Sequence, residues 1–233
     1  MILLLASAVL CLIHEPSPQE APAPVAANAL EPEPDWRRLG RSLWFDARQK
    51  QLVIKARVAL REGPLEHLLC LKGTKEHEAI LATDALPREF HAGLLLTGAE
   101  PGHPVRFVPR FEPPSGTPIA IELVWKSDGK TNRIDARQWV KDEKTKKPLA
   151  HGWVFAGSEL FQDAITKKMI YAADEGDLIT VANFGSAILD LPFASSASDA
   201  DRVFSADPAR VPSTGTEVFL MLRPRPAQQQ KKP

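Results

Sequence analysis

The side chains best suited to chemistry gather in one stretch of the chain, from Gly63 to Val105. Four of the six histidines and one of the two cysteines lie there, at positions His67, Cys70, His77, His91 and His103. A cysteine thiolate is a nucleophile and a metal ligand, and an imidazole is a base and a metal ligand. The stretch is therefore the first place to look for a catalytic pair or a metal centre.

A hairpin expected in this stretch places Cys70 beside His77. Residues 65–71 and 77–82 have strand-like sequences, and Lys72–Lys75 between them, with its glycine, is typical of a hairpin turn. This spacing puts the two side chains directly opposite each other, with Cβ atoms roughly 4.5–5.5 Å apart. An imidazolium so close lowers the pKa of a thiol, so one hypothesis is an enzyme that uses Cys70 and His77 as nucleophile and base.

Two other interpretations of these residues stay open. A zinc or copper site would use Cys70, His77 and His91 if the helix that carries His91 packs on the same face, although the spacing matches no established finger pattern. The structural interpretation places Cys70 in the core, because free cysteine is among the most buried residue types. His67 is expected to face away from Cys70, since side chains alternate along a strand, and His103 is expected in a loop.

Outside this stretch, alternating apolar residues predict mostly strands. The expected strands cover residues 43–46, 52–60, 119–125, 152–156, 168–172, 178–182, 202–205 and 218–222. Asp128-Gly129 predicts a hairpin turn, and the acidic turn at Gly176-Asp177 is expected to be solvated rather than to bind calcium.

One helix is well defined, over about 86–97, with Asp84 as its cap and Gly98 after its end. Shorter helices are expected over 134–140 and 185–189. Many strands with one inserted helix predict an α+β fold built mainly on an antiparallel β-sheet.

The apolar run from Ile2 to Ile13 predicts a signal peptide in residues 1–27, cleaved after Ala27. A Pro/Ala/Glu-rich spacer (28–35), a single domain (36–223) and a disordered tail (224–233) are expected to follow. The protein is thus expected in the periplasm or outside the cell, with no stable membrane span after signal removal; retention of the uncleaved segment as an anchor is the less favoured alternative.

Charge and cysteine content restrict partners and cofactors. Lys plus Arg and Asp plus Glu both number 29, so no basic surplus exists to bind nucleic acid. After signal removal Cys70 is the remaining thiol, and one cysteine supplies neither a disulfide nor an iron–sulfur cluster. No cofactor is therefore expected, with zinc and copper left open.

Several motifs of this chain resemble exported bacterial proteins that carry a YdjY domain. They are Gly63–Glu66, Thr74–Glu78, His91–Leu96, Gly98–Gly102, Trp153–Ser158, Gly176–Ile179 and Asp190–Pro192. The resemblance spans nearly all of residues 36–222 and implies an exported bacterial domain in a family without a characterised activity. Some relatives carry a ferredoxin-like iron–sulfur segment, which suggests a redox setting; with one mature cysteine, this chain would need a partner protein for such a role.

These observations favour a non-enzymatic exported binding or accessory domain, whose ligand or protein partner the sequence does not identify. The alternatives are the Cys70/His77 enzyme and a metal-binding redox accessory protein.

Overall fold

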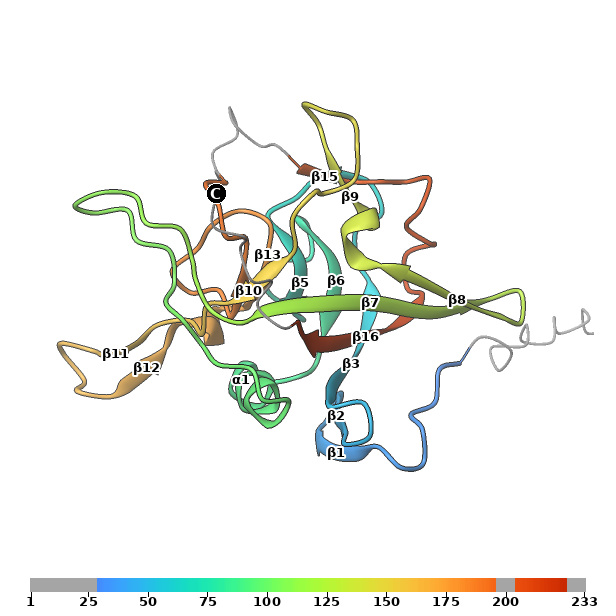
Figure 1. Ribbon diagram of the computed structural model, residues 1–233, viewed down its shortest axis with the longest axis horizontal. Helices are drawn as coiled ribbons and strands as arrows, with labels where there is room; N and C mark the ends of the chain where they lie inside the picture. The colour runs from blue at the N-terminus through green and yellow to red at the C-terminus, as the bar shows by residue number, and fades with distance from the viewer. Residues whose placement is uncertain (1–28, 196–203, 226–233) are drawn as a thin grey trace, which may run out of the picture.

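The computed structural model describes residues 29–195 and 204–225, so the predicted signal peptide and most of the predicted tail lie outside the described residues. Within those ranges there is one α-helix, α1 (Pro87–Leu96), and there are two short 3-10 helices, η2 (Ala136–Trp139) and η3 (Ala172–Glu175) (Figure 1). The strands are β1 (Arg37–Gly40), β2 (Leu43–Asp46), β3 (Gln51–Val58), β4 (Gly63–Pro64), β5 (His67–Leu71), β6 (Ala79–Thr83), β7 (Pro118–Ser127), β8 (Lys130–Asp135), β9 (Val140–Asp142), β10 (Trp153–Phe155), β11 (Leu160–Gln162), β12 (Met169–Tyr171), β13 (Asp177–Thr180), β14 (Leu189–Asp190), β15 (Phe204–Ala206) and β16 (Glu217–Pro224).

Eight of these strands close into a β-barrel in the order β3-β16-β7-β10-β14-β13-β5-β6. Strand β3 closes the barrel because one of its edges pairs with a single strand and the other edge pairs with two strands in succession. One edge pairs with β16 over Leu52 to Arg57, whereas the other is shared between β2, which pairs with residues 51–54, and β6, which pairs with Arg57 and Val58. Short pieces of sheet lie outside the barrel: β11 pairs with β12, and β15 lies between β4 and β9.

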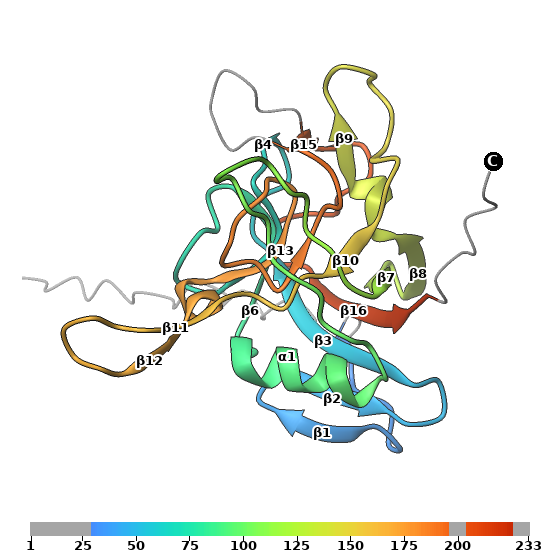
Figure 2. The same ribbon diagram turned by 60° about the vertical axis from the view of Figure 1, so that its left-hand side comes forward.

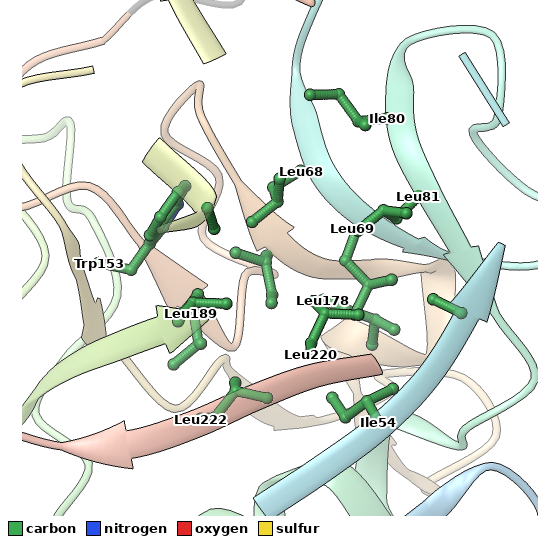
Figure 3. Packing of buried hydrophobic residues seen from close by; sticks show 14 of the residues in the cluster. Ile54, Leu68, Leu69, Ile80, Leu81, Trp153, Leu178, Leu189, Leu220 and Leu222 are labelled. Atoms are coloured by element: carbon green, nitrogen blue, oxygen red, sulfur yellow. The ribbon is translucent and has the colours of Figure 1, made fainter. Parts of the chain in front are cut away.

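The main core fills the barrel. Side chains from opposite walls, such as Ile54, Leu69, Leu178 and Leu220, point toward one another in Figure 3, and each of these four is fully buried. Full burial of one such side chain stabilises the fold by roughly 1.5–3 kcal/mol. Successive side chains of β3 point to opposite faces of the sheet, so Ile54 faces the barrel interior and Val53 faces the outside.

A smaller apolar cluster covers the outer face of the sheet. Val53, Trp44 and Phe219 form its centre, with the Trp44 and Phe219 ring centroids 5.9 Å apart at a near-perpendicular angle. Leu30 from the predicted spacer is buried in the same cluster, and its carbonyl oxygen accepts a hydrogen bond from Lys55 Nζ at 3.1 Å. The described part of that segment therefore packs against the domain.

The predicted fold class is wrong. Strands account for 41% of the structure and helices for 10%, which makes it a mainly β fold with a closed barrel rather than an α+β sheet. Two barrel pairs are also parallel, β5–β6 and β13–β14. The alternation of apolar residues identified most strands, but closure depends on long-range pairing, of which the sequence pattern carries no local signal.

The helix predictions have mixed outcomes. The helix over 86–97 is confirmed as α1, but Asp84 does not cap it; the cap position is Leu86, without a side-chain hydrogen bond. The helix expected over 134–140 is a short 3-10 turn that Asp135 caps. The segment expected to be helical at 185–189 instead leads through a turn into β14.

The predicted antiparallel hairpin in the Cys–His stretch is also wrong, because β5 and β6 run parallel and Cys70 lies opposite Ala82. The return segment (Lys72–Glu78) carries the chain back along the barrel instead of turning it around. It is held at both ends, where Lys72 N donates to Thr83 O and Glu66 N donates to Glu78 O.

Two arms extend from the same side of the barrel, the left side in Figure 1. The upper arm is the loop between α1 and β7, closed by bridges between Pro101 and Gly116 and between Arg106 and Glu112. The lower arm is the β11–β12 hairpin, whose turn comprises residues 163–168. The base of the lower arm lies close to α1.

Candidate functional site: the pocket beside the helix

The structure separates Cys70 from the environment expected for a nucleophile. Its side chain is fully buried, and burial raises the pKa of the thiol to about 11. A thiol with that pKa stays protonated near neutral pH and is a poor nucleophile. The structure therefore favours the core interpretation of Cys70.

His77 lies on the surface of the return segment, with a side chain that is 76% exposed and a ring nitrogen 3.7 Å from Glu78 Oε1. The hairpin that would have paired it with Cys70 is wrong, so the inference of a nucleophile–base pair loses its geometric basis. A catalytic role for either residue stays a prediction.

The proposed metal ligands Cys70, His77 and His91 do not form a cluster of ligand atoms in the described part of the chain. There, the group with suitable spacing is Glu66, His67 and Glu78, whose ligand atoms lie within 4.8 Å of one another. His91 instead lies on α1 and contacts Tyr171.

His67 belongs to a buried polar network centred on Asp177. The Asp177 side chain is 2% exposed, and its Oδ1 accepts from His67 Nε2 at 2.7 Å and from Lys75 Nζ at 2.5 Å. The Ser186 hydroxyl donates to Oδ2. The Phe184 ring stacks on the His67 imidazole, with ring centroids 5.4 Å apart, and covers the network on that side.

This network keeps Asp177 ionised. Burial alone would raise the pKa of the carboxyl, but hydrogen bonds from His67, Lys75 and Ser186 outweigh burial and hold that pKa well below its usual range. Through Lys75, Asp177 ties the return segment to β13. The acidic turn was expected to be solvated. Asp174 and Glu175 in it are exposed, but Asp177 is a buried anchor, so the expectation is wrong for Asp177.

The close packing of the return segment against β13 explains why a glycine, Gly176, precedes Asp177. Gly176 has φ +115°, and a Cβ there would lie 2.4 Å from the Thr74 hydroxyl oxygen. Glycine is therefore required both by conformation and by the close approach of the return segment.

A pocket of about 450 Å³ opens beside α1, where the helix meets the bases of both arms. We call it the α1 pocket. Its lining combines apolar and polar side chains and consists of Arg88, His91, Pro101, Gly102, Ala156, Gly157, Ser158, Leu160 and Tyr171. The volume lies within the range typical of small-molecule sites.

A chain of hydrogen bonds crosses the wall of the α1 pocket. The Tyr171 hydroxyl donates to Gly157 O at 3.1 Å, and the Tyr171 hydroxyl oxygen lies 2.8 Å from His91 Nδ1. Since the hydroxyl proton is used on Gly157, His91 Nδ1 carries the proton of the second bond. Nε2 of His91 is then a hydrogen-bond acceptor on a residue that lines the pocket.

The two titratable rings in this hydrogen-bond chain, those of His91 and Tyr171, are both held neutral at physiological pH. Burial lowers the pKa of His91, against a smaller opposing effect of the Gly157 carbonyl. Burial, together with the nearby Asp174 carboxylate, raises the pKa of Tyr171 well above its usual range. The His91 ring also packs edge-on against Phe155, with ring centroids 4.9 Å apart, which fixes its orientation.

Arg88 supplies the positive charge at the rim. Its Nε and a terminal nitrogen both donate to Asp174 Oδ2, at 3.1 and 2.9 Å, and the guanidinium lies 5.7 Å from the centroid of the Tyr171 ring. The ion pair leaves the other edge of the planar group able to donate. The pocket thus offers a neutral acceptor, an apolar surface and a cationic rim.

The sequence singled out His91 but missed the residues that give it a role. Tyr171 is the only tyrosine in the chain, and that rarity was a signal for closer inspection. Its proximity to His91 arises from tertiary structure across 80 positions, which no local pattern encodes.

The fold and pocket define the class: a mainly β barrel domain with a single α-helix and a mixed polar and apolar pocket beside it. The chain matches the YdjY domain over residues 43–223, more than half of its length, and therefore belongs to the YdjY domain family. The predicted resemblance is confirmed. No curated protein and no solved structure matches the chain. None of the helices within the described residues has the length and hydropathy of a membrane-spanning segment.

Proposed function

We propose that this YdjY domain is an exported binding domain and that its ligand occupies the α1 pocket. The observation that carries the proposal is the hydrogen-bond chain from His91 through Tyr171 to Gly157, which fixes one acceptor nitrogen on an otherwise largely apolar wall. A few fixed polar groups on an apolar surface are typical of ligand sites.

The chemistry of the wall supports one class of ligand. His91 Nε2 accepts a hydrogen bond, and Leu160 and Pro101 offer apolar contacts. An aromatic or other apolar molecule that carries an N–H or O–H donor satisfies both. Binding, rather than catalysis, agrees with a buried Cys70 whose pKa is raised to about 11.

Export is part of the proposal and is supported by the apolar run Ile2–Ile13. The proposed function requires no iron–sulfur cluster, and it leaves any redox role to a partner protein. The Glu66, His67 and Glu78 group is the arrangement in the described residues that a zinc or copper titration would address.

Indole and 1-methylindole test the proposal as a matched pair, because methylation removes the N–H donor and leaves the apolar ring. Titration of ¹⁵N-histidine-labelled protein should show saturable shifts of the His91 Nε2 signal with indole. Binding of 1-methylindole should be roughly tenfold weaker, the effect of about 1.4 kcal/mol for one lost hydrogen bond.

His91→Phe keeps an aromatic ring against Phe155 and removes both nitrogens, so it should lose the preference for indole. His77→Ala, which alters an exposed histidine outside the pocket, is the matched control and should bind as the unaltered protein does. Equal binding of the two indoles to the unaltered protein, or no saturable binding, would contradict the proposal.

A further inference from the structure

The large exposed hydrophobic side chains of the described residues are not scattered over the surface. They lie on three segments: α1, the upper arm and the lower arm. On the arms they are Phe107, Val108, Phe111, Leu160, Phe161, Ile165 and Met169. Exposed apolar side chains concentrated on protruding segments mark an interaction site more often than a chance distribution does.

The tip of the upper arm consists almost entirely of such residues. Arg106 and Glu112 close it with two backbone hydrogen bonds, so residues 107–111 form the turn. Val108 is 83% exposed at this tip, and the Phe107 and Phe111 rings flank it with centroids 6.1 Å apart. The apolar side chains here cover one another only in part, and none of the three belongs to the two core clusters found among the described residues.

The lower arm ends in a similar way. Asp163 holds its turn together, because one carboxylate oxygen accepts from the backbone N–H of Ile165 and of Thr166. This turn presents Ile165, which is 90% exposed. At this exposure the Ile165 side chain buries little apolar surface within the domain.

Cations lie beside both tips. In residues 106–112 there are two arginines, Arg106 and Arg110, and one glutamate, and in residues 163–168 there are two lysines, Lys167 and Lys168, and one aspartate. Each tip thus has an excess of one positive charge. Arginine and lysine placed one to three residues from an exposed apolar side chain suit the boundary between lipid headgroups and acyl chains.

We propose that the two arms bind the surface of an anionic lipid bilayer by inserting their apolar tips between the headgroups. Figure 1 shows both arms leaving the barrel as separate projections on the left, and Figure 2 shows the lower arm extending well beyond the barrel, so a single plane on the left side of Figure 1 meets both tips. Two separate apolar points with cations beside them suit a flat lipid surface better than a protein partner, which buries a continuous patch. The bound domain would lie on the bilayer, with only the tips entering it by about 5–10 Å.

A tryptophan added at each tip reads the position of that tip, as the change in quenching relative to the unaltered protein, because the five native tryptophans are common to all variants. Val108→Trp and Ile165→Trp place the reporter on the upper and lower tips, and Lys130→Trp places it on the exposed β7–β8 turn, which lies on the opposite side of the barrel in Figure 1. Each full-length variant is mixed with vesicles of equal parts phosphatidylglycerol and brominated phosphatidylcholine. All three share the same N-terminal apolar run, so differences in quenching report on the arms.

We expect the bromine atoms to quench the added tryptophan at positions 108 and 165 and to leave the one at 130 unquenched. Protection of the upper arm from proteolysis by vesicles measures binding through the arms without a tryptophan reporter. The double variant Val108→Asp/Ile165→Asp should reduce this protection at least tenfold. Its melting temperature should stay unchanged because both side chains are exposed. Pure phosphatidylcholine vesicles should protect the arm at least tenfold less well than anionic ones.

Equal quenching at all three positions, or none at 108 and 165, overturns the proposal. Equal protection by neutral and anionic vesicles overturns the role of the cations. Sedimentation without lipid supplies the third outcome: a dimer that the double aspartate variant abolishes would make the arms a protein interface instead. The proposal is independent of the α1 pocket, since His91→Phe should leave tip insertion intact.

Discussion

Two aspartates on neighbouring strands, Asp177 on β13 and Asp190 on β14, are both buried away from water, yet their pKa values shift in opposite directions. Asp177 accepts from Lys75 and His67, and its pKa is held below the usual range. Asp190 is fully buried among neutral donors, and burial raises its pKa to about 7. The two sites share a fold, a strand pair and a residue type, so the difference lies in the partners.

The partners of Asp190 satisfy only half of its carboxyl. Oδ1 accepts from Thr180 Oγ1 at 2.9 Å, Asn183 Nδ2 at 3.0 Å and Leu191 N at 2.7 Å, while Oδ2 has no hydrogen-bond partner among the described residues. Neutral donors reduce the cost of a buried carboxylate without offsetting it, whereas a cation within hydrogen-bond distance does offset it. Asp177 is thus a charged anchor, and Asp190 is a neutral acid below pH about 7.

The largest expected effect comes from removing the charge of Asp177. Asp177→Asn leaves Lys75 without its carboxylate partner in a largely buried place, and we expect a loss of about 3 kcal/mol in the free energy of unfolding. Urea denaturation at pH 6 measures it. Asp190→Asn under the same conditions is the matched control and should cost less than about 1 kcal/mol, because the carboxyl is already neutral there. Similar losses in the two variants would remove the distinction between the sites.

Removing one hydrogen-bond donor from each site should also cost more stability at Asp177 than at Asp190. Ser186→Ala removes a hydrogen bond to a charged carboxylate, and we expect a cost of about 2 kcal/mol; Thr180→Val removes one to a neutral acid, for which about 1 kcal/mol is expected. Both are compared by denaturant unfolding at pH 6. A larger cost for Thr180→Val would mean that Asp190, and not Asp177, carries the charge.

Stability should depend on pH through Asp190. Its folded pKa of about 7 lies above the ordinary value of 3.8, so its contribution is complete below pH 3.8 and is lost as pH rises through 7. One pKa unit corresponds to about 1.4 kcal/mol, so the unaltered protein should lose about that much relative to Asp190→Asn between pH 6 and pH 8. A constant difference between the two proteins over this range would refute the raised pKa.

Asp177 should have the opposite dependence, because its contribution is present above the ordinary pKa of 3.8 and is lost as pH falls through the lowered folded value. Asp177→Asn should therefore flatten the acid side of the stability profile and leave the side above pH 6 unchanged. The two variants together separate the acid limb from the neutral limb.

The most local effect should appear at Cys70, which lies opposite Asp177 in the β5–β13 register. Iodoacetamide at pH 8 should leave this buried thiol almost unmodified in the folded protein. Asp177→Asn frees the return segment and should raise the rate of labelling about tenfold through local opening, whereas Asp190→Asn should not. Mass spectrometry of the peptide that contains Cys70 measures the rate; rapid labelling of the unaltered protein would restore the nucleophile hypothesis.

Local patterns predicted most strands and the α-helix. Alternation from Leu52 to Val58 gave β3, and Asp128-Gly129 gave the turn between β7 and β8, where both residues have positive φ. These features depend on neighbours along the chain. The barrel closure depends on Arg57 and Val58 meeting β6 after β2 has ended, and no sequence pattern marks the point at which one edge of a strand changes partners.

The site was predictable only in part, for the same reason. Gly73 indicated a turn correctly, but β6 runs parallel to β5, and the return segment before it is anchored through Lys75 by Asp177 from 102 positions away. His91 was singled out for its chemistry, while its partner Tyr171 was not. Residue type identified candidates; burial and distant partners decided what they do.

The position of β16 has a consequence for how the barrel assembles. This strand is the last of the barrel to be synthesised, yet it lies between β3 and β7 and pairs with both along its length. Until residue 224 is available, the rest of the barrel has two unpaired edges and cannot close. Closure of the barrel then waits for the final strand, and the long-range pairs that this strand makes with β3 give the barrel a high contact order, which favours slow folding.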